Sequence, residues 1–268
     1  MNLKSLLKEK LTDFQLKNLK TAFDIVGDIA IIEIPGELEP VEQIIAVNVM
    51  RLNKSVKTVV KKVGAHEGEF RLQKYKFLVG EEKYITIHKE SAVKLKVDLN
   101  KTYFSVRLSS ERLRIAKMIK PGESILVVGA GCGPYPLVFS KNSKTMKIVA
   151  IEKNVDSCHM FRENILLNKV KNIEVICCDF SEFQSEEKFD RVVLALPYIS
   201  HEILGKIVKF CKIGTICHFY GFYHEDEFSK VKDLIISSFG VVSFLDLVKC
   251  GQKKPRIWRI CQDYALIQ

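Results

Sequence analysis

Hydrophobic and polar positions follow two different patterns along the chain, and the change between them falls near residue 100. Before it, residues 1–23 have helical periodicity, 24–35 form a β-rich run, and 39–52 form a second helical segment. We therefore predict a small α+β domain over residues 1–100, completed by four short strands. These strands are expected at 56–64, 74–80, 83–90 and 92–99.

From Ser109 onward, continuous apolar strands alternate with amphipathic helices. Strands of this kind are buried on both faces, which is typical of a parallel sheet covered by helices. The pattern predicts a doubly wound, Rossmann-like α/β domain over residues 101–268, with its ligand at the carboxyl ends of the strands. The alternation runs through 123–131, 145–154, 155–170, 172–180, 189–198, 201–211, 214–222, 227–240 and 256–267.

Composition supports a folded protein with a basic surface. The chain has 268 residues, of which 47% are hydrophobic, enough for a substantial core in one large domain or two. The 42 Lys and Arg against 32 Asp and Glu give a net charge of +10. This charge weakly favours a polyanionic binding partner such as RNA. No apolar run approaches the roughly 18–20 residues that cross a bilayer. We therefore expect no membrane association.

The eight cysteines favour reduced thiols over disulfides or a metal site. No signal peptide is evident at the N-terminus, and the cysteines lie mostly in apolar surroundings. The sequence contains no C-x-x-C pair, so we predict no structural zinc. A cytoplasmic protein is expected. The cysteines are Cys132, Cys158, Cys177, Cys178, Cys211, Cys217, Cys250 and Cys261.

A glycine-rich turn follows the first strand of the Rossmann-like domain. Gly129, Gly131 and Gly133 occupy it, and glycines there allow tight backbone geometry and the close approach of a nucleotide-like ligand. The order is G-x-G-x-G followed by Pro134, rather than the G-x-G-x-x-G that leads into a helix in dinucleotide-binding domains. A dehydrogenase that binds a pyrophosphate is therefore disfavoured.

Acidic residues end the next two strands. Glu152 is placed to accept the two hydroxyls of a ribose, and Asp179 to meet the exocyclic amine of an adenine. A glycine turn followed by these acids fits S-adenosylmethionine better than NAD. Methyltransferases of this class often carry an acid two residues before the glycine turn, where this chain has Val127.

Six segments together resemble one family, the archaeal and eukaryotic tRNA (guanine-N1)-methyltransferases, which modify the purine 3′ of the anticodon. The resemblance runs from about Asp24 to the end. The related aminocarboxypropyltransferases of the wybutosine pathway share the fold but usually depart at positions where this chain keeps Arg107-Leu108 and Gly133-Pro134-Tyr135, which favours methyl transfer. The segments are GEFRLQKY, YFSVRLSSER, VGAGCGPYPL, VAIEKN, ENILLNKVKNIEV and DRVVLALP.

The resemblance implies roles for individual residues. Glu111 would remove the N1 proton of the guanine, because N1 is a poor nucleophile while protonated. Arg71 would stabilise the negative charge that then develops toward O6. The resemblance also assigns positions to the cofactor site, alongside the glycine turn and the two strand-end acids. These positions are Arg107, Ala195 and Pro197.

Simpler interpretations stand beside these roles. Glu111 falls in the first turn of a helix that begins near Ser109, where a carboxylate favours the helix dipole, and Arg71 alone is one of many cations. Two positions depart from the family. Ala195 replaces the asparagine of an N-L-P tripeptide, and Val106 replaces a proline. Tyr198, directly after the tripeptide, could stack on a flipped purine or pack in the core.

Binding of tRNA would depend on the small domain and on basic surfaces. Many family members carry an additional N-terminal domain that grips the tRNA elbow, and we find no room for it before Asp24. Two clusters without acids in the sequence are candidate RNA contacts or merely solvated faces. One consists of Arg51, Lys54, Lys57, Lys61 and Lys62, and the other of Lys249, Lys253, Lys254 and Arg256.

The sequence therefore predicts a tRNA (guanine(37)-N1)-methyltransferase that uses S-adenosylmethionine and acts as a monomer. The alternatives are an aminocarboxypropyltransferase or second methyltransferase of the wybutosine pathway, and an RNA-binding homologue without activity, which Val127 and Ala195 motivate. His218 and His224 lack the spacing of metal ligands, and Trp258 is expected to close the core.

Overall fold

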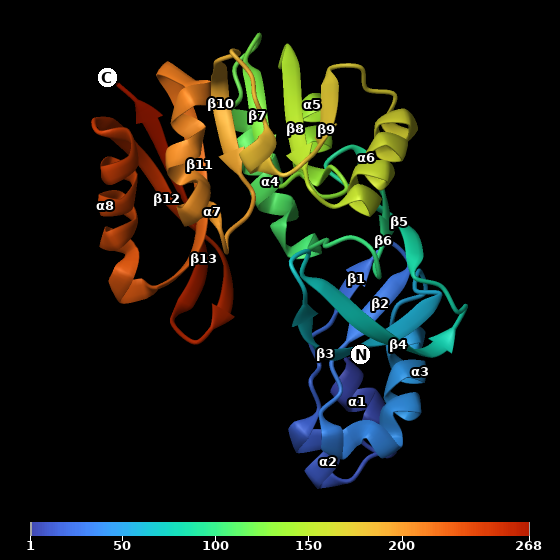
Figure 1. Cartoon of the computed structure of the whole chain (residues 1–268). Coiled ribbons are helices and arrows are strands. Elements are labelled where there is room, and N and C mark those ends of the chain that lie inside the picture. The colour runs from blue at the N-terminus through green and yellow to red at the C-terminus, as the bar shows by residue number, and fades with distance from the viewer. Residues whose placement is uncertain (1, 268) are drawn as a thin grey trace. The chain divides into compact units, whose positions relative to one another are not determined.

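The structure is a computed structural model that describes residues 2–267. The chain divides into two compact units (Figure 1). The first comprises Met1–Lys89 and Lys94–Val106, and the second comprises Glu90–Val93 and Arg107–Gln268. Each unit has its own hydrophobic core. Within residues 2–267, none of the helices has the length and apolar character that a membrane crossing requires.

The N-terminal segment of the first unit forms two short helices, α1 (Leu3–Leu7) and α2 (Asp13–Asn18). Each helix begins at a capping box, in which the side chain of Asn2 or Thr12 accepts a hydrogen bond from the amide three residues later. A capping box fixes the start of a helix. The predicted helical periodicity before Asp24 is therefore split between two helices, which bury leucines in the core of the unit.

The first unit contains a four-stranded sheet in the order β1-β2-β3-β4. Strands β2 and β3 are parallel and are joined through a helix, whereas β1 and β4 pair antiparallel at the two edges. A separate two-stranded sheet, β5-β6, follows. The elements are β1 (Asp24–Val26), β2 (Ile29–Ile32), η1 (Gly36–Val41), α3 (Glu42–Leu52), β3 (Thr58–Glu67), β4 (Leu72–Gly80), β5 (Ile85–Glu90) and β6 (Val93–Asp98).

The second unit is built on a seven-stranded sheet in the order β12-β13-β11-β10-β7-β8-β9. Strands β11, β10, β7, β8 and β9 are parallel, which confirms the predicted doubly wound arrangement. Its elements are η2 (Val106–Leu108), α4 (Ser109–Met118), β7 (Ser124–Val128), α5 (Pro134–Asn142), β8 (Lys147–Glu152), α6 (Val155–Asn168), β9 (Ile173–Cys177), η3 (Phe180–Glu182), β10 (Phe189–Leu194), α7 (Ser200–Ile203), η4 (Leu204–Phe210), β11 (Cys211–His224), η5 (Glu225–Glu227), α8 (Phe228–Phe239), β12 (Val242–Lys254) and β13 (Ile257–Leu266).

Helices cover both faces of this sheet. Successive residues of a strand point to opposite faces. On β11, Cys217 and Phe219 belong to the core that includes Val231 and Ile235 of α8. Tyr220, on the other face, reaches α4 through a hydrogen bond. The face under α4 therefore carries polar side chains from the middle of the sheet, and the candidate site lies there.

The edge strand β12 is not among the predicted elements. It pairs antiparallel with β13, and its register shifts three times, including between Phe244 and Leu247 and between Lys249 and Gly251. Each bulge interrupts the period-two alternation by which a strand is recognised. The hairpin β12–β13 also adds more antiparallel pairing to the sheet than expected, because β13 runs antiparallel to β11 as well as to β12.

Candidate active site

The glycine turn lies between β7 and α5 in left-handed backbone conformations. The φ angles of Gly129, Gly131 and Gly133 are 78°, 57° and 93°. The amides of Gly129 and Ala130 both donate to the carbonyl of Ile151, which ties the turn to β8. Residues with a Cβ rarely adopt these angles. The three glycines are therefore required by the path of the backbone.

Two of these glycines also make room for protein side chains. A Cβ on Gly129 would lie 2.3 Å from Cγ of Leu196, and a Cβ on Gly133 would lie 2.1 Å from the ring of Phe161. Leu196 comes from the loop after β10, so this loop lies directly against the turn. From the sequence, these glycines are expected to allow tight backbone geometry and the close approach of a ligand. At these two positions, packing within the chain already requires them.

Glu152 ends β8 beside the turn, as predicted. Its Oε2 accepts a hydrogen bond from the amide of Gly131 at 2.7 Å, and its Oε1 accepts one from the amide of Asn154 at 2.8 Å. Burial raises the pKa of Glu152, and these amide donors oppose that rise. A carboxylate has about four lone-pair sites, so the Glu152 carboxylate is suited to accept a hydroxyl of a ribose in addition to these amides.

Asp179 follows β9 and is engaged by its neighbours. Its Oδ2 lies 2.8 Å from Nζ of Lys153, and its Oδ1 accepts hydrogen bonds from the amide and hydroxyl of Ser181. The hydrogen bonds from Lys153 and Ser181 hold the pKa of Asp179 well below its usual range. Asp179 therefore caps η3, and its predicted contact with an adenine stays a prediction.

The loop after β10 holds Ala195 and Pro197, which are both half-buried. The amide of Ala195 donates to the carbonyl of Val128 at 2.9 Å, so this loop begins at the glycine turn. A cavity of about 410 Å³ lies between η3 and η4, and no glycine of the turn lines it. Its lining residues are Phe180, Ser181, Gly205, Lys206, Val208 and Lys209.

Glu111 lies in the first turn of α4 and is only 5% exposed. Arg114 holds its carboxylate with two hydrogen bonds, from Nε to Oε2 at 2.7 Å and from Nη2 to Oε1 at 2.8 Å. The hydroxyl of Tyr220 donates to Oε1 at 2.6 Å. Burial raises the pKa of Tyr220, so this hydroxyl stays a donor. Glu111 is thus a helix-start residue that is buried and oriented, rather than an acid on a solvated surface.

A chain of buried polar groups continues from Arg114 into the sheet. Its Nη1 donates to Oδ2 of Asp263 at 2.6 Å, and Oδ1 of Asp263 lies 2.6 Å from Nδ1 of His218. Nη1 of Arg191 lies 2.7 Å from Nε2 of His218. Because a guanidinium can only donate, Nε2 accepts and Nδ1 carries the proton that Asp263 accepts. Burial lowers the pKa of His218, in agreement with a neutral ring.

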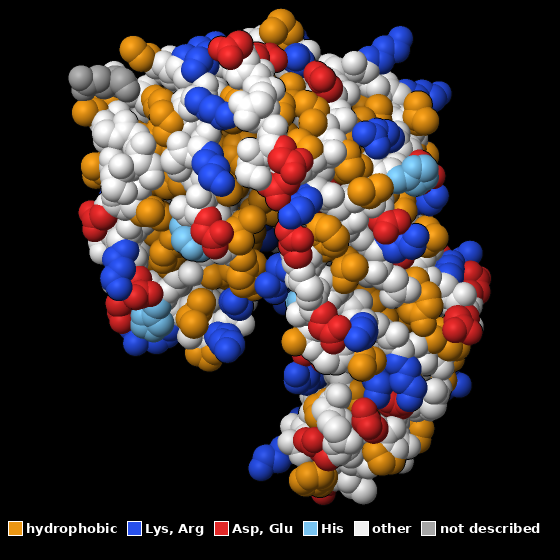
Figure 2. All heavy atoms as spheres, viewed as in Figure 1, with side chains coloured by type: hydrophobic (Ala, Val, Ile, Leu, Met, Phe, Trp, Pro, Cys, Tyr) orange, Lys and Arg blue, Asp and Glu red, His pale blue; other side chains and the backbone are white. Residues whose placement is uncertain are grey.

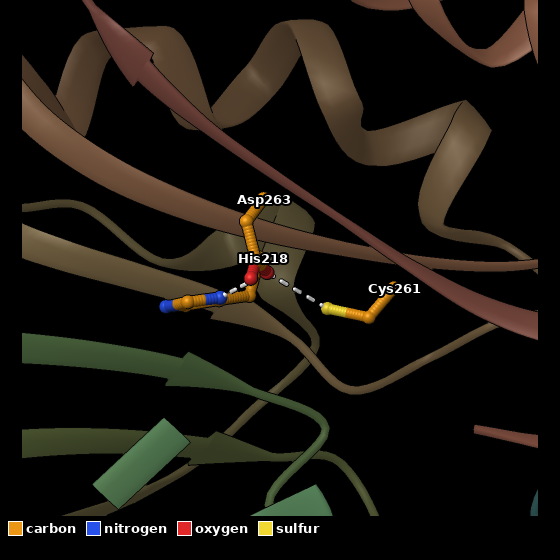
Figure 3. Close-up of side chains that lie close together, drawn as sticks. All are labelled: His218, Cys261 and Asp263. Carbon is orange, nitrogen blue, oxygen red and sulfur yellow. Dashed lines mark hydrogen bonds and ion pairs between the residues drawn. The ribbon is translucent and has the colours of Figure 1, made fainter. Parts of the chain in front are cut away.

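His218, Cys261 and Asp263 offer a group of ligand atoms that lie within 4.8 Å of one another (Figure 3). These atoms already bond within the chain. The Cys261 thiol donates to Oδ1 of Asp263 at 3.1 Å, and both ring nitrogens of His218 are engaged. The guanidiniums of Arg114 and Arg191 contact the same group. Two adjacent cations disfavour a metal ion, so we interpret the group as a hydrogen-bonded network.

The other two arginines around Glu111 differ from Arg114. Arg112 is buried and forms two hydrogen bonds of 2.6 Å with the carboxylate of Glu90. Arg107, which was predicted to be near the cofactor, lies exposed in η2. Its predicted role therefore stays a prediction.

Arg71 belongs to the first unit and lies in the turn between β3 and β4. Its φ angle is 53°, a left-handed value that is uncommon for a residue with a side chain. Its amide donates to the carbonyl of Gly68, and its own carbonyl lies 2.9 Å from Nδ1 of His66. Backbone strain of this kind clusters at functional sites. The pairing of Arg71 with Glu111 of the second unit stays a prediction.

The two basic clusters differ in the structure. Lys61 of the first cluster is buried and pairs with Glu39 and Glu42, and Lys62 pairs with Glu33. That cluster is free of acids in the sequence but not in space, which corrects the prediction. The second cluster lies at the end of the hairpin β12–β13, where Figure 2 shows cationic side chains beside hydrophobic ones. Of its members, Arg256 pairs with Glu225 and Asp226.

Sequence reasoning missed Tyr220, Asp263 and Arg259. They lie in buried strands of the sheet, and the weak signal was the polar groups that these strands carry at alternate positions. Trp258, as predicted, packs against the core. All eight cysteines are free thiols.

Comparison with known proteins places this chain in a family. Residues 86–237 match the model of the TRM5/TYW2 methyltransferase domain, which is more than half of the chain. The chain belongs to the TRM5/TYW2 methyltransferase family. Residues 3–83 match a second model, the TYW2 N-terminal domain. The family predicted from sequence is therefore confirmed, and so is a transferase that uses S-adenosylmethionine.

Curated relatives in this family have different activities. The tRNA (guanine(37)-N(1))-methyltransferase Trm5b of Pyrococcus abyssi is 36% identical over 92% of this chain and 76% of that protein. The tRNA(Phe) (4-demethylwyosine(37)-C(7)) aminocarboxypropyltransferase of Pyrococcus horikoshii is 31% identical over 99% of this chain and 96% of that protein. The methyltransferase Taw22 of Nanoarchaeum equitans, named for both guanine(37)-N(1) and 4-demethylwyosine(37), is 38% identical over 92% of this chain and all of that protein.

Solved structures of the family share the fold. The crystal structure of Trm5b from Pyrococcus abyssi has a TM-score of 0.89 at 34% identity and covers 96% of this chain and 79% of that one. The complex of aTrm5 with tRNALeu has a TM-score of 0.89 at 27% identity, over 100% of this chain and 78% of that one. These likenesses confirm the predicted fold class and support tRNA as the partner of the family.

Proposed function

We propose that this protein is an S-adenosylmethionine-dependent tRNA (guanine(37)-N1)-methyltransferase. The observation that carries the proposal is Glu111, a buried carboxylate that Arg114 and Tyr220 hold in one orientation. A buried and oriented acid is what the removal of a proton from guanine N1 requires. A tRNA-modifying activity also agrees with the +10 charge of the chain and with an expected place in the cytoplasm.

Glu111 would act as the general base. A carboxylate offers about four lone-pair sites, and the hydrogen bonds from Arg114 and Tyr220 use three of them. In the proposed reaction this carboxylate would accept the N1 proton. Because Arg114 and Tyr220 fix the carboxylate before the substrate binds, little reorganisation would be needed during the reaction.

The cofactor would lie along the carboxyl ends of β7, β8 and β10. Bound there, S-adenosylmethionine supplies a methyl group on a positive sulfonium. The glycine turn fits such a ligand because Gly129, Gly131 and Gly133 have left-handed backbone conformations and because Glu152 presents a carboxylate at its rim. Leu196 and Ala195 would border the pocket from the loop after β10. Val127 offers no acid to the ammonium of the cofactor.

Arg71 would stabilise the charge that develops on guanine O6. Its left-handed conformation in a hairpin turn supports a role beyond folding. Since Arg71 belongs to the first unit, the proposal requires residues of both units to act on one base. The base would have to leave its stack in the anticodon loop to reach them.

Aminocarboxypropyl transfer is the second candidate function, and a specific observation favours it. Residues 3–83 match the TYW2 N-terminal domain, and the Pyrococcus horikoshii aminocarboxypropyltransferase aligns with nearly the whole chain. Both reactions would use the same cofactor and differ in the group that leaves its sulfur. Retention of Arg107-Leu108 and of Gly133-Pro134-Tyr135 supports methyl transfer.

One experiment separates the two functions. The full chain is incubated with S-adenosylmethionine and either an unmodified tRNA transcript with G37 or tRNA that carries 4-demethylwyosine, and the nucleosides are then analysed by mass. We expect 1-methylguanosine from the G37 transcript, and no product when the transcript carries A37. An aminocarboxypropyl product on 4-demethylwyosine, with the G37 transcript unchanged, would replace the first proposal by the second.

A further inference from the structure

Arg259 of β13 is a buried arginine without an anionic partner. Only 7% of the residue is exposed. Its Nε has no hydrogen-bond partner, and its guanidinium forms no ion pair within the described residues 2–267. By contrast, the buried Arg112 and Arg191 form two-point hydrogen bonds with Glu90 and Glu123.

The surroundings of Arg259 connect it to the candidate active site. Its guanidinium carbon lies 5.2 Å from the ring centre of Tyr220, whose hydroxyl donates to Glu111. The ring of Tyr220 lies 5.9 Å from that of Tyr135, the second residue of α5 after the glycine turn. The hydroxyl of Tyr135 is buried and also has no hydrogen-bond partner. Two unused donors therefore flank Tyr220.

Strand register places these donors at the edge where the ligand is expected. The last parallel pairs at that edge join Leu194 to Val128 and to Phe219. Arg259 pairs with Phe222, three residues further along β11 in the same direction. Arg259 therefore lies beyond the carboxyl ends of β7 and β10, on the side of the sheet that leads to the glycine turn.

A buried cation without a partner loses hydration and gains no Coulomb attraction in return, so such groups are usually paired. A ligand with negative charge would supply the missing partner. We propose that Arg259, together with the Tyr135 hydroxyl, binds an anionic oxygen group of a ligand, either the carboxylate of the amino-acid end of the cofactor or a phosphate of the RNA. This assignment rests on the proposed function, because that function brings both ligands to this edge.

The test compares three ligands on the full chain and on Arg259→Met. S-adenosylhomocysteine carries the carboxylate, 5′-methylthioadenosine lacks the amino-acid end, and a G37 tRNA transcript carries phosphates. Calorimetry measures the first two and filter binding measures the third. The variant is expected to lose affinity for one class by about 10- to 100-fold, because hydrogen bonds to charged groups are the strong ones.

The source of the anion follows from which affinity falls. Weaker binding of S-adenosylhomocysteine with unchanged binding of 5′-methylthioadenosine assigns Arg259 to the cofactor carboxylate. Weaker binding of tRNA with both small ligands unchanged assigns it to a phosphate. Unchanged affinity for all three overturns the proposal. These measurements need no turnover, so they stay decisive even if neither methyl nor aminocarboxypropyl transfer is found.

Two further variants serve as controls that distinguish a loss of ligand binding from a folding defect. Arg259→Lys keeps the charge and is expected to bind within a few-fold of the parent. Arg256→Met removes an exposed arginine three residues away, which pairs with Glu225 and Asp226, and should leave S-adenosylhomocysteine binding unchanged. The melting temperature of ligand-free Arg259→Met should stay level or rise, because an unpaired buried charge is removed. A large fall would indicate a structural role and would contradict the proposal.

Discussion

Glu111 and Tyr220 illustrate how the site depends on single hydrogen bonds. Arg114 fixes the plane of the Glu111 carboxylate, and Tyr220 reaches the same oxygen from the sheet. Asp263 in turn holds Arg114 from β13. Burial alone would raise the pKa of Asp263, but the hydrogen bonds from His218 and Arg114 and the charge of Arg114 outweigh it and hold that pKa below its usual range. Asp263 therefore stays ionised, and it holds the Arg114 guanidinium that orients Glu111.

Replacing Tyr220 with phenylalanine should slow methyl transfer without weakening cofactor binding. The Tyr220→Phe variant removes one donor to the Glu111 carboxylate, and hydrogen bonds to charged groups contribute about 1.5–3 kcal/mol. We expect the single-turnover rate to fall by about tenfold or more. Tyr223→Phe is the matched control, because Tyr223 lies on the same strand and packs against the opposite core. Equal rates for Tyr220→Phe and the control would refute the positioning role.

His218 should make the free energy of unfolding decrease as pH falls below about 7. Burial lowers its pKa in the folded protein, so the unfolded chain binds a proton that the folded chain does not. Stability is then full above the unfolded pKa of about 6.5 and declines as pH falls, by up to about 1.4 kcal/mol per pH unit. Asp263, whose pKa is lowered in the folded protein, also contributes to the free energy of unfolding. That contribution is lost only below about pH 4.

Urea unfolding of the parent and of His218→Asn at pH 7.5, 6.5 and 5.5 checks this expectation. The asparagine amide can still donate to Asp263 but does not titrate. The variant should be less stable at pH 7.5 and should show a flatter dependence on pH. Parallel curves for the two proteins would show that His218 does not titrate on unfolding.

At the scale of elements, the hairpin β12–β13 is the strongest candidate for an RNA contact outside the catalytic residues. Nζ of Lys253 lies 4.4 Å from the ring centre of Tyr198 and 4.6 Å from that of Phe222. The two rings are 4.7 Å apart and come from different elements. In the described part of the chain, neither Lys253 nor Lys254 forms an ion pair. Cations beside aromatic rings favour single-stranded RNA.

Removing Lys253 and Lys254 together should weaken tRNA binding and reduce its dependence on salt. Each phosphate contact contributes a slope of about −0.9 to −0.7 in the logarithm of affinity against the logarithm of salt concentration. The magnitude of the slope should therefore decrease by about 1.4 to 1.8. The control removes Lys120 and Lys144, which lie exposed near the start of β7, at the amino ends of the parallel strands. If both double variants bind alike across the salt series, the hairpin is not the contact.

Most elements could be predicted from sequence, but most partners of the site could not. Strands such as β7 are continuous apolar runs that end in glycine, and Glu152 follows β8 in the expected place. The partners of Glu111 and Arg114 lie 109 and 149 residues away in the sequence. No periodicity links such positions, because the sheet order that joins them is set by tertiary packing. The edge strand β12 was missed because its bulges break the alternation.

At the scale of the whole molecule, the proposed reaction needs both units. Each unit has its own core, and Arg71 and Glu111 lie in different ones. If both residues act on one guanine, a substitution of one should reduce the rate of methyl transfer less when the other residue has already been replaced. Arg71→Ala and Glu111→Gln should each slow methyl transfer, and the double variant should be faster than the product of the two effects predicts. Strictly multiplicative effects would show that the two residues act independently.

The most direct measurement of the central claim is single-turnover methyl transfer by Glu111→Gln. The full chain in excess over a G37 tRNA transcript is mixed with S-adenosylmethionine that carries a labelled methyl group, and calorimetry confirms that the variant binds the cofactor. Loss of a general base is worth about 10²- to 10⁴-fold, so we predict a fall in rate of that size with cofactor affinity unchanged. A variant that forms 1-methylguanosine at the parent rate would contradict the account.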